Sequence, residues 1–404
     1  MAQGNKFQSI AILVVAEILA LSLWFISAAV LPEMVAESQM SPMRQALLSS
    51  AVQAGFVVGA LISAFLGLAD RFDPRRVFMV CAVTAGLANA VLLVAPIGGA
   101  LAISMRFVTG ALLAGAYPVG MKIAAGWGTK DRGLLIGLLV GAVTLGSASP
   151  HLASLLGGAD WRTAVSITSV AAILGGLLVL GSGLGPYHAR AKRFDINCIK
   201  VAWTDRRIRL AYGGYLGHMW ELYAMWAWIG VVAAASYGAT MPKEEAVEFA
   251  KLTAFLAIGL GGVACVIGGI FADKIGKPEV TIIAMVVSGA CAVGTAVTFG
   301  GPAWLTFVLI LLWGISIVPD SPQFSAIVAD TAVAENAGSL MTLQTALGFA
   351  LTILTVQLAP LLAETTGWPV VLIILGLGPV FGVFSMSRLR QIMSRKPTSS
   401  PAKT

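Results

Sequence analysis

Gly67-Leu68-Ala69-Asp70-Arg71, closely followed by Arg75-Arg76, returns 203 residues later as Gly269-Ile270-Phe271-Ala272-Asp273-Lys274-Ile275-Gly276-Lys277. Each copy of this charged phrase ends one long apolar run and precedes another. A repeat with a period of half the chain indicates two homologous halves. Because the chain is strongly apolar, we expect these halves to be two bundles of membrane-spanning helices.

The composition supports a protein surrounded by lipid. The 404 residues are 58% hydrophobic and only 11% charged, and the mean hydropathy is +0.88, whereas a soluble domain carries about 25% charged residues. The 45 glycines fit the same interpretation, because small residues let membrane helices approach closely. The four cysteines have the spacing of neither a metal site nor a disulfide framework.

Apolar runs long enough to cross a bilayer, which takes about 20 residues, define the predicted fold. The prediction is an all-α integral membrane protein with twelve transmembrane helices in two pseudo-symmetric six-helix bundles. The bundles are expected at residues 1–185 and 208–390, with a cytoplasmic linker at 186–207 and a disordered cytoplasmic tail at 391–404. The predicted spans are 8–31, 45–69, 76–96, 99–123, 131–155, 162–185, 208–236, 249–272, 279–299, 303–329, 337–362 and 367–387.

The basic residues fix the predicted orientation. If the N-terminus lies inside, 21 of the 26 Lys and Arg residues fall on cytoplasmic segments, 4 fall on outer segments, and Arg106 lies within a span. This positive-inside asymmetry places both termini in the cytoplasm. It also explains the net charge of +7 without a nucleic-acid partner. We expect a monomer in a bacterial-type cytoplasmic (inner) membrane.

The repeated phrase resembles the motif of the major facilitator superfamily, Gly-x-Leu-Ala-Asp-Arg-x-Gly-Arg-Arg/Lys, and the resemblance covers essentially the whole chain. The first copy departs from the motif because Leu66 stands at the leading glycine and Asp73-Pro74 replace the turn glycine. Helix 4 also carries the family's Arg-x-x-x-Gly pattern at Arg106 and Gly110, but helix 5 lacks the adjacent Gly-Pro pair of antiporters. In the family, the motif aspartate and its basic neighbours latch one conformation. The resemblance gives this role to Asp70, Arg71, Arg76, Asp273, Lys274 and Lys277, unless these are only loop charges that orient the chain.

Ionisable side chains inside the predicted spans are the main functional signal. Each costs roughly 2.5–3.5 kcal/mol on insertion scales, so each suggests a function. Five of the six fall on helices 1, 4, 7 and 10, which line the central cavity in the family fold, and His151 falls on helix 5. The predicted substrate and proton site comprises Glu17, Arg106, Tyr117, His218, Glu221, Tyr223, Asp320 and Gln323.

These residues suggest a secondary active transporter that works by alternating access and is coupled to protons. An apolar cavity disfavours the charged form of a carboxylate, so Glu17, Glu221 or Asp320 could bind and release a proton. Our first hypothesis couples transport through Glu221 or Asp320, with Arg106 as counter-ion or anion ligand. The acids could instead hold an organic cation or a divalent metal, so the sign of the solute stays open. The expected partners are a small polar or charged solute, protons and the lipid bilayer.

Two other classes compete with a transporter. A membrane-embedded enzyme would need a nucleophile–base set or a His-Glu-x-x-His motif, and His218 with Glu221 supplies only a fragment of one. A sensor or assembly factor of the same fold would usually add a soluble domain, for which only the linker and tail are available. The sequence has no phosphate-cradling loop, so neither ATP-driven transport nor any cofactor is expected.

Overall fold

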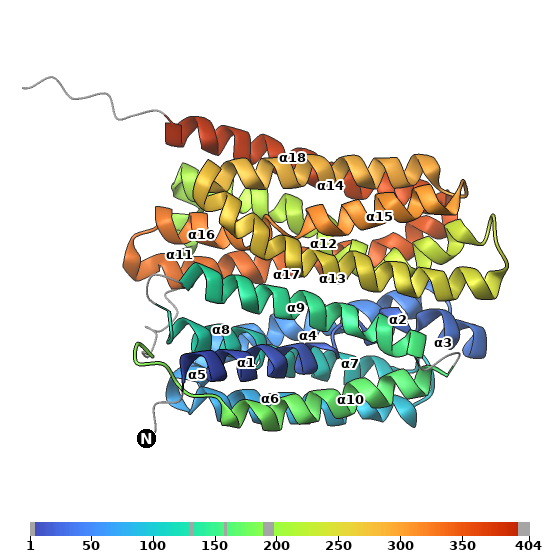
Figure 1. The fold of residues 1–404 in the computed structure, drawn as a ribbon, viewed down its shortest axis with the longest axis horizontal. Helices are drawn as coiled ribbons and strands as arrows, with labels where there is room; N and C mark the ends of the chain where they lie inside the picture. Colours follow the sequence, from blue (N-terminus) through green and yellow to red (C-terminus); the bar gives the residue numbers. More distant parts are fainter. Residues whose placement is uncertain (1–4, 129–131, 157–159, 189–197, 395–404) are drawn as a thin grey trace, which may run out of the picture.

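The structure is a computed structural model that describes residues 5–128, 132–156, 160–188 and 198–394 (Figure 1). Within these ranges every regular element is helical and no strand occurs, which confirms the predicted all-α fold. The side chain of Asp70 and the tail from residue 395 onward are outside the described part of the chain.

Twelve membrane crossings account for the helices. Ten segments are long and apolar enough to span a bilayer on their own. The other two crossings are the long α12 and the first crossing, which is divided among α1, α2 and α3. In chain order the helices are α1 Lys6–Leu21, α2 Ile26–Ala29, α3 Leu31–Ser38, α4 Pro42–Leu66, α5 Leu68–Arg71, α6 Pro74–Ala90, α7 Ala100–Leu113, α8 Tyr117–Ala125, α9 Arg132–Leu156, α10 Trp161–Leu178, α11 Cys198–Thr204, α12 Arg206–Tyr237, α13 Lys243–Ile275, α14 Lys277–Thr298, α15 Ala303–Ile317, α16 Ser321–Thr331, α17 Ala334–Thr366 and α18 Trp368–Ser394.

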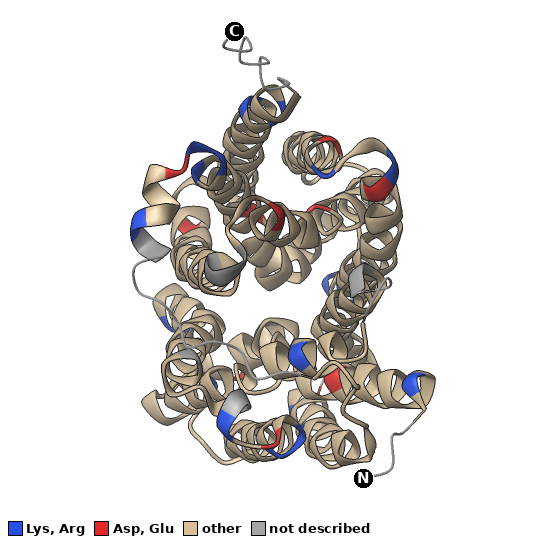
Figure 2. Ribbon diagram, turned by 90° about the vertical axis from the view of Figure 1, so that its left-hand side faces the viewer, with Lys and Arg blue, Asp and Glu red and all other residues tan. Residues whose placement is uncertain are grey.

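The twelve crossings form two bundles that lie side by side (Figures 1 and 2). Helices α1 to α10 form the first half and α12 to α18 form the second. Across the boundary, α9 packs along α13 and α4 packs along α17. The predicted linker contains the short helix α11, and α18 continues to Ser394, so it includes the first four residues of the predicted tail.

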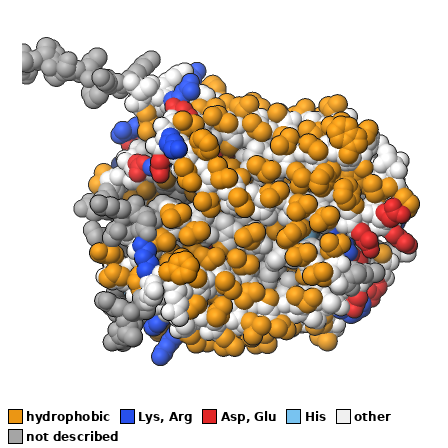
Figure 3. Space-filling view, in the orientation of Figure 1, with side chains coloured by type: hydrophobic (Ala, Val, Ile, Leu, Met, Phe, Trp, Pro, Cys, Tyr) orange, Lys and Arg blue, Asp and Glu red, His pale blue; other side chains and the backbone are white. Residues whose placement is uncertain are grey.

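The outer surface has the pattern expected for a membrane protein. Large apolar side chains such as those of Val170, Val286 and Phe381, in the middle of α10, α14 and α18, are exposed, and Figure 3 shows this apolar band with charges gathered at its two ends. The two ends of the described chain, Asn5 and Ser394, lie at the same end of the bundles (Figure 1). We call this the terminal end and the opposite one the far end.

Three of the four central crossings are broken in the middle of the bilayer. The first crossing is interrupted between α1 and α2, the fourth between α7 and α8, and the tenth between α15 and α16. Pro118 and Pro319 explain the last two breaks, because proline has no N–H to donate to the preceding turn. The seventh crossing, α12, runs unbroken for 32 residues. Such breaks free backbone groups where they can line a solute site.

Glycines hold the central helices close to their neighbours in both halves. A methyl group on Gly110 would overlap the carbonyl oxygen of Val52 on α4, and one on Gly314 would overlap the carbonyl oxygen of Ala257 on α13. Gly314 follows Gly110 by 204 positions, so the two contacts are repeats of one another. The hydrophobic effect cannot drive helix association inside lipid, so the helices rely on the close van der Waals packing that small residues allow.

Candidate functional site

Arg106 is fully buried on α7 and bridges three crossings of the first half. Its Nη1 donates to Asn89 Oδ1 at 2.9 Å, and Asn89 Nδ2 donates in turn to Ser169 Oγ at 2.9 Å. Its Nη2 donates to the carbonyl oxygen of Trp24 at 2.7 Å. That carbonyl lies in the break of the first crossing, where no helical N–H can reach it. Arg106 therefore stabilises the broken helix.

Glu221 is buried at the middle of α12 and has two partners on neighbouring helices of the second half. Its Oε1 accepts from Trp313 Nε1 on α15 at 2.7 Å, and its Oε2 accepts from Ser288 Oγ on α14 at 2.9 Å. Both carboxylate oxygens are thus hydrogen-bonded. Glu221 ties three helices of one bundle together.

Glu17 has no such partners. It is fully buried on α1, and neither carboxylate oxygen forms a hydrogen bond with any described residue. Its carboxylate lies against Gly120 on α8, just beyond the break of the fourth crossing, and within electrostatic reach of the half-buried Tyr117. A buried polar group without a partner is costly, so an unpartnered carboxylate between two broken helices suggests a binding role.

Asp320 and His218 form a second polar pair near the tenth crossing. His218 Nδ1 lies 3.0 Å from Asp320 Oδ1, and both side chains are 1% exposed. The other nitrogen of His218 and the Oδ2 atom of Asp320 have no hydrogen-bond partner in the described part of the chain. Asp320 directly precedes α16, whose buried Gln323 lies one turn further on. The pair therefore lies at the break of the tenth crossing.

Aromatic side chains from the two halves meet between the bundles. The rings of Trp24 and Phe56 come from the first half, and those of Tyr223 and Phe349 come from the second. The Trp24 centroid lies 4.8 Å from that of Phe56, 5.8 Å from Tyr223 and 5.6 Å from Phe349. We call these four residues the aromatic plug. It is buried, so the two halves are closed against each other here.

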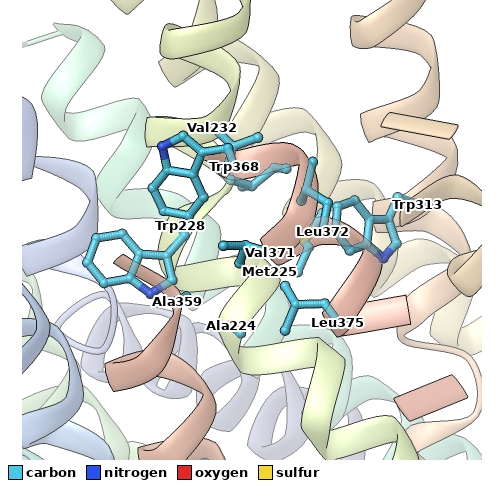
Figure 4. A pocket seen from close by; sticks show the side chains of 11 residues that line it. Ala224, Met225, Trp228, Val232, Trp313, Ala359, Trp368, Val371, Leu372 and Leu375 are labelled. Carbon is cyan, nitrogen blue, oxygen red and sulfur yellow. The ribbon is translucent and has the colours of Figure 1, made fainter. Parts of the chain in front are cut away.

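Two small cavities lie near the buried polar residues in this conformation. A cavity of about 10 Å³ lies within the second half, among Trp228, Trp313 and Trp368 (Figure 4). A second cavity of about 10 Å³ lies between the halves, beside His151 and Lys251. Each is about the size that one water requires. The structure therefore represents a closed state, in which Glu17 and Asp320 are both sealed from solvent.

An ion pair joins the two halves at the far end. Lys251 Nζ on α13 pairs with Glu33 Oε1 on α3, and both side chains are largely buried. Ser154 on α9 also donates to Glu33 Oε1, at 3.4 Å. His151, which the sequence placed within a span on helix 5, lines the adjoining cavity. No feature of the sequence pointed to this pair, because both residues are ordinary charges near the ends of spans.

The first copy of the repeated phrase is organised around an acid that the motif does not include. Asp73 caps α6 and pairs with Arg75 at 2.6 Å, and Arg75 Nη1 also donates to the carbonyl oxygen of Ser182 at 3.1 Å. The hydrogen bonds from Arg75 lower the pKa of Asp73 below its ordinary value. Arg71 and Arg76 are exposed.

The second copy reaches a different helix. Lys277, at the start of α14, pairs with Asp330 on α16. Asp273 and Lys274 are exposed and form no ion pair with any described residue. The structure thus links the second copy to the broken tenth crossing, and the predicted latch roles of these residues stay predictions.

The sequence did not identify the partners of the predicted residues. Asn89, Ser288 and Trp313 bind Arg106 and Glu221, yet they look like ordinary residues of apolar helices. Comparing the two halves pairs Glu221 with Glu17 and Trp228 with Trp24 at the same spacing of 204 positions, but it gives no signal for these partners. Among the described residues no group of three or more His, Cys, Asp or Glu side chains could hold a metal.

The comparisons with known proteins agree with this architecture. The family model of the Major Facilitator Superfamily matches residues 13–354. The fold is similar to a mutant of the nucleoside transporter NupG, at 13% identity over 95% of this chain and 100% of that one, with a TM-score of 0.73. It is also similar to the xylose transporter XylE from E. coli in a partially occluded inward-open conformation. The two share 13% identity over 95% of this chain and 99% of that one, with a TM-score of 0.73.

A third similar structure is a bacterial homolog of the human lysosomal transporter Spinster, inward-facing and occupied. It shares 12% identity over 99% of this chain and 100% of that one, with a TM-score of 0.73. No curated protein sequence matches the chain. At these identities the structures show the fold alone, while the family model covers most of the chain. The chain is a multi-pass membrane transporter that belongs to the Major Facilitator Superfamily.

Proposed function

We propose that the chain is a proton-coupled secondary active transporter of the cytoplasmic membrane, with both termini in the cytoplasm, and that Glu17 binds the coupled proton. The observation that carries this proposal is the isolation of Glu17, whose two carboxylate oxygens are buried without partners. A carboxylate in such a site must be neutral or bind a cation, because burying an unpaired charge is prohibitively costly. Proton binding is the simplest way to meet that requirement in the closed state.

The surroundings of Glu221 and Arg106 make them less suitable for this role. Both oxygens of Glu221 are occupied by Trp313 and Ser288 within one bundle. Arg106 is occupied by Asn89 and by the Trp24 carbonyl, also within one bundle. Asp320 retains His218 as its partner. The proposal therefore moves the coupling site from Glu221 or Asp320 to Glu17, and it gives Arg106 a positioning role.

Alternating access is supported by contacts that can separate. The Glu33–Lys251 pair closes the far end between the halves, and the aromatic plug closes the centre. Glu17 lies on the terminal side of the plug, because the first crossing starts at the terminal end and Glu17 precedes Trp24 on it by seven residues. Opening at the terminal end would therefore bring water to Glu17 while the far-end ion pair stays closed. If the terminal end closes before the Glu33–Lys251 pair opens the far end, a proton on Glu17 can cross the membrane without a continuous pore.

Transport in proteoliposomes tests the proposal. A solute found by counterflow screening should accumulate severalfold when a pH gradient is imposed, and Glu17→Gln should lose this accumulation by at least about tenfold. Counterflow without a gradient should survive in Glu17→Gln at a solute concentration high enough to offset any loss of affinity, because the amide keeps the shape of the side chain but cannot exchange a proton.

Glu364→Gln is the matched control, since Glu364 is exposed at the end of α17. It makes the same chemical change away from the bundle centre and should behave like the wild type. Full gradient-driven accumulation in Glu17→Gln would sink the assignment of Glu17. Absence of flux with every solute would instead argue for a transporter-fold sensor or assembly protein.

A further inference from the structure

We infer that the central site binds a monovalent organic cation with an apolar, ring-bearing body, its charge on Glu17 and its body against the aromatic plug. This inference rests on the proposed function and names the substrate class of the same site. Three features of the described residues carry it. They are the negative character of the unpartnered polar groups, the aromatic side chains supplied by both halves, and the distance between Glu17 and the aromatic plug.

The free polar groups at the centre favour a positive solute. Both oxygens of Glu17 and the Oδ2 atom of Asp320 are buried acceptors without partners. The basic groups there are largely engaged, because Arg106 donates to Asn89 and Trp24 while His218 pairs with Asp320. Each keeps one buried nitrogen without a described partner, Nε of Arg106 and Nε2 of His218. An anion would have to displace these contacts and would meet two carboxylates. A cation would instead satisfy Glu17 directly.

The walls of the site are aromatic on both sides. Trp24 and Phe56 belong to one half and Tyr223 and Phe349 to the other, with Phe56 and Phe349 at 4.6 Å and Tyr223 and Phe349 at 5.0 Å. When the halves separate, the ring faces now buried against each other become available to a solute. Ring faces attract cations and stack on apolar rings. The indole Nε1 of Trp24 also lacks a partner among the described residues.

The spacing sets the size of the solute. Trp24 follows Glu17 by seven residues on the first crossing. The part up to Leu21 is helical and rises about 6 Å at 1.5 Å per residue, and the i→i−3 turns at Leu23 and Trp24 rise about 2 Å per residue, so the two positions are on the order of 10 Å apart. A cationic centre attached to one aromatic ring can reach from the carboxylate to the plug. A bare metal ion cannot use the rings, and the described part of the chain offers it no cluster of three ligands.

A set of probes that share one ring tests the inference on the full purified chain. The probes are benzyltrimethylammonium, the neutral benzyl alcohol and the anionic phenylacetate, with xylose and uridine as neutral polar solutes. Benzyltrimethylammonium should raise the melting temperature in detergent by several degrees, because a ligand stabilises the state that binds it. It should also bind at least about tenfold more tightly than benzyl alcohol or phenylacetate.

Variants separate the site from adsorption to the apolar surface. Glu17→Gln should weaken benzyltrimethylammonium binding about tenfold or more and Trp24→Ala severalfold. Trp304→Ala, which removes an exposed indole, should leave binding unchanged. Equal binding in Glu17→Gln, or no response to benzyltrimethylammonium at all, overturns the inference.

The two proposals can fail separately. If xylose, uridine or phenylacetate is accumulated under a pH gradient in a Glu17-dependent way and the cation is not bound, the substrate class is wrong and the proton coupling stands. If the cation binds through Glu17 but its flux ignores the pH gradient, the substrate class stands and the coupling is wrong.

Discussion

Glu17 and Glu221 occupy the same position in the two halves, 204 residues apart, yet their surroundings are opposite. Glu221 accepts hydrogen bonds from Trp313 and Ser288 and links three helices of its bundle. Glu17 is equally buried and accepts none from the described residues. The matching tryptophans differ in the same way, because Trp228 Nε1 donates to the Val356 carbonyl at 2.9 Å while Trp24 Nε1 has no described partner.

This difference shows that homologous residues of the two halves have come to lie in different surroundings, with hydrogen-bond partners in the second half and without them in the first. In the second half, Glu221 and Trp228 form hydrogen bonds with other residues of the same bundle, so their polar atoms have partners. In the first half, the matching Glu17 and Trp24 are buried without hydrogen-bond partners among the described residues. The helix break makes the two halves differ further, since α1 ends at Leu21 while α12 runs through the corresponding region unbroken. Unsatisfied groups on a broken helix are what a binding site requires.

Leucine at Glu221 and at Glu17 should have the most different effects on stability, and these variants test whether the two acids differ as described. Glu221→Leu leaves the buried Trp313 N–H without its acceptor and removes the bond from Ser288, which should cost roughly 2–4 kcal/mol of stability. Glu17→Leu removes a buried carboxylate that has no partner, so stability should stay the same or rise. Thermal unfolding of both variants in one detergent measures the difference.

The outcome that would contradict this difference is an equal loss of melting temperature in the two variants. It would mean that Glu17 has a structural partner comparable to Trp313. Glu364→Leu, at an exposed position, controls for a general effect of removing an acid.

Alanine at the repeated glycines, Gly110 and Gly314, should have an intermediate effect on stability. These variants test the scaffold, where the two halves are alike. Gly110→Ala and Gly314→Ala would each push a methyl group into the backbone of the neighbouring helix, at Val52 and Ala257 respectively. Overpacking of this kind costs about 1–3 kcal/mol. Both variants should therefore lower the melting temperature by similar amounts.

Gly137→Ala serves as the control for the glycine variants, since no atom lies within 4 Å of the added methyl group. A large loss in one half only would show that the scaffold, as well as the site, has diverged between the halves.

The sequence predicted the scaffold better than the site, for a physical reason. The duplicated phrase, the apolar runs and the basic residues act over many residues at once, so the twelve crossings of the family fold followed from them. Glu17, Arg106 and Asp320 were also identified, because a charge inside an apolar run is conspicuous. What the sequence could not show was which charge is satisfied. That depends on Asn89, Ser288 and Trp313, which are distant in sequence and unremarkable in type. Pro118 and Pro319 mark two of the breaks in the sequence, but no proline or glycine marks the break after Leu21.

The smallest expected effect concerns a charged contact that only the first half has. Glu37 accepts hydrogen bonds from Arg162 and from Trp161 Nε1, which joins the far end of the first crossing to the start of α10, and Met241 stands 204 positions later. The hydrogen bonds from Arg162 and Trp161 lower the pKa of Glu37 to about 2. A lowered pKa means that the contact stabilises the fold above the ordinary pKa of a glutamate, near 4.5, and that this contribution fades as the pH falls toward 2.

Hydrogen exchange of the first turn of α10 should therefore quicken between pH 4.5 and 2, after correction for intrinsic rates, while the start of α18 in the second half should show no such step. Glu37→Gln should abolish the step, because the amide cannot titrate. The contact is solvent-exposed, so its contribution is small and should shrink further in high salt. A step of the same size at the start of α18, or one that persists in Glu37→Gln, would mean that the acid sensitivity belongs to both halves and that this corner does not distinguish them.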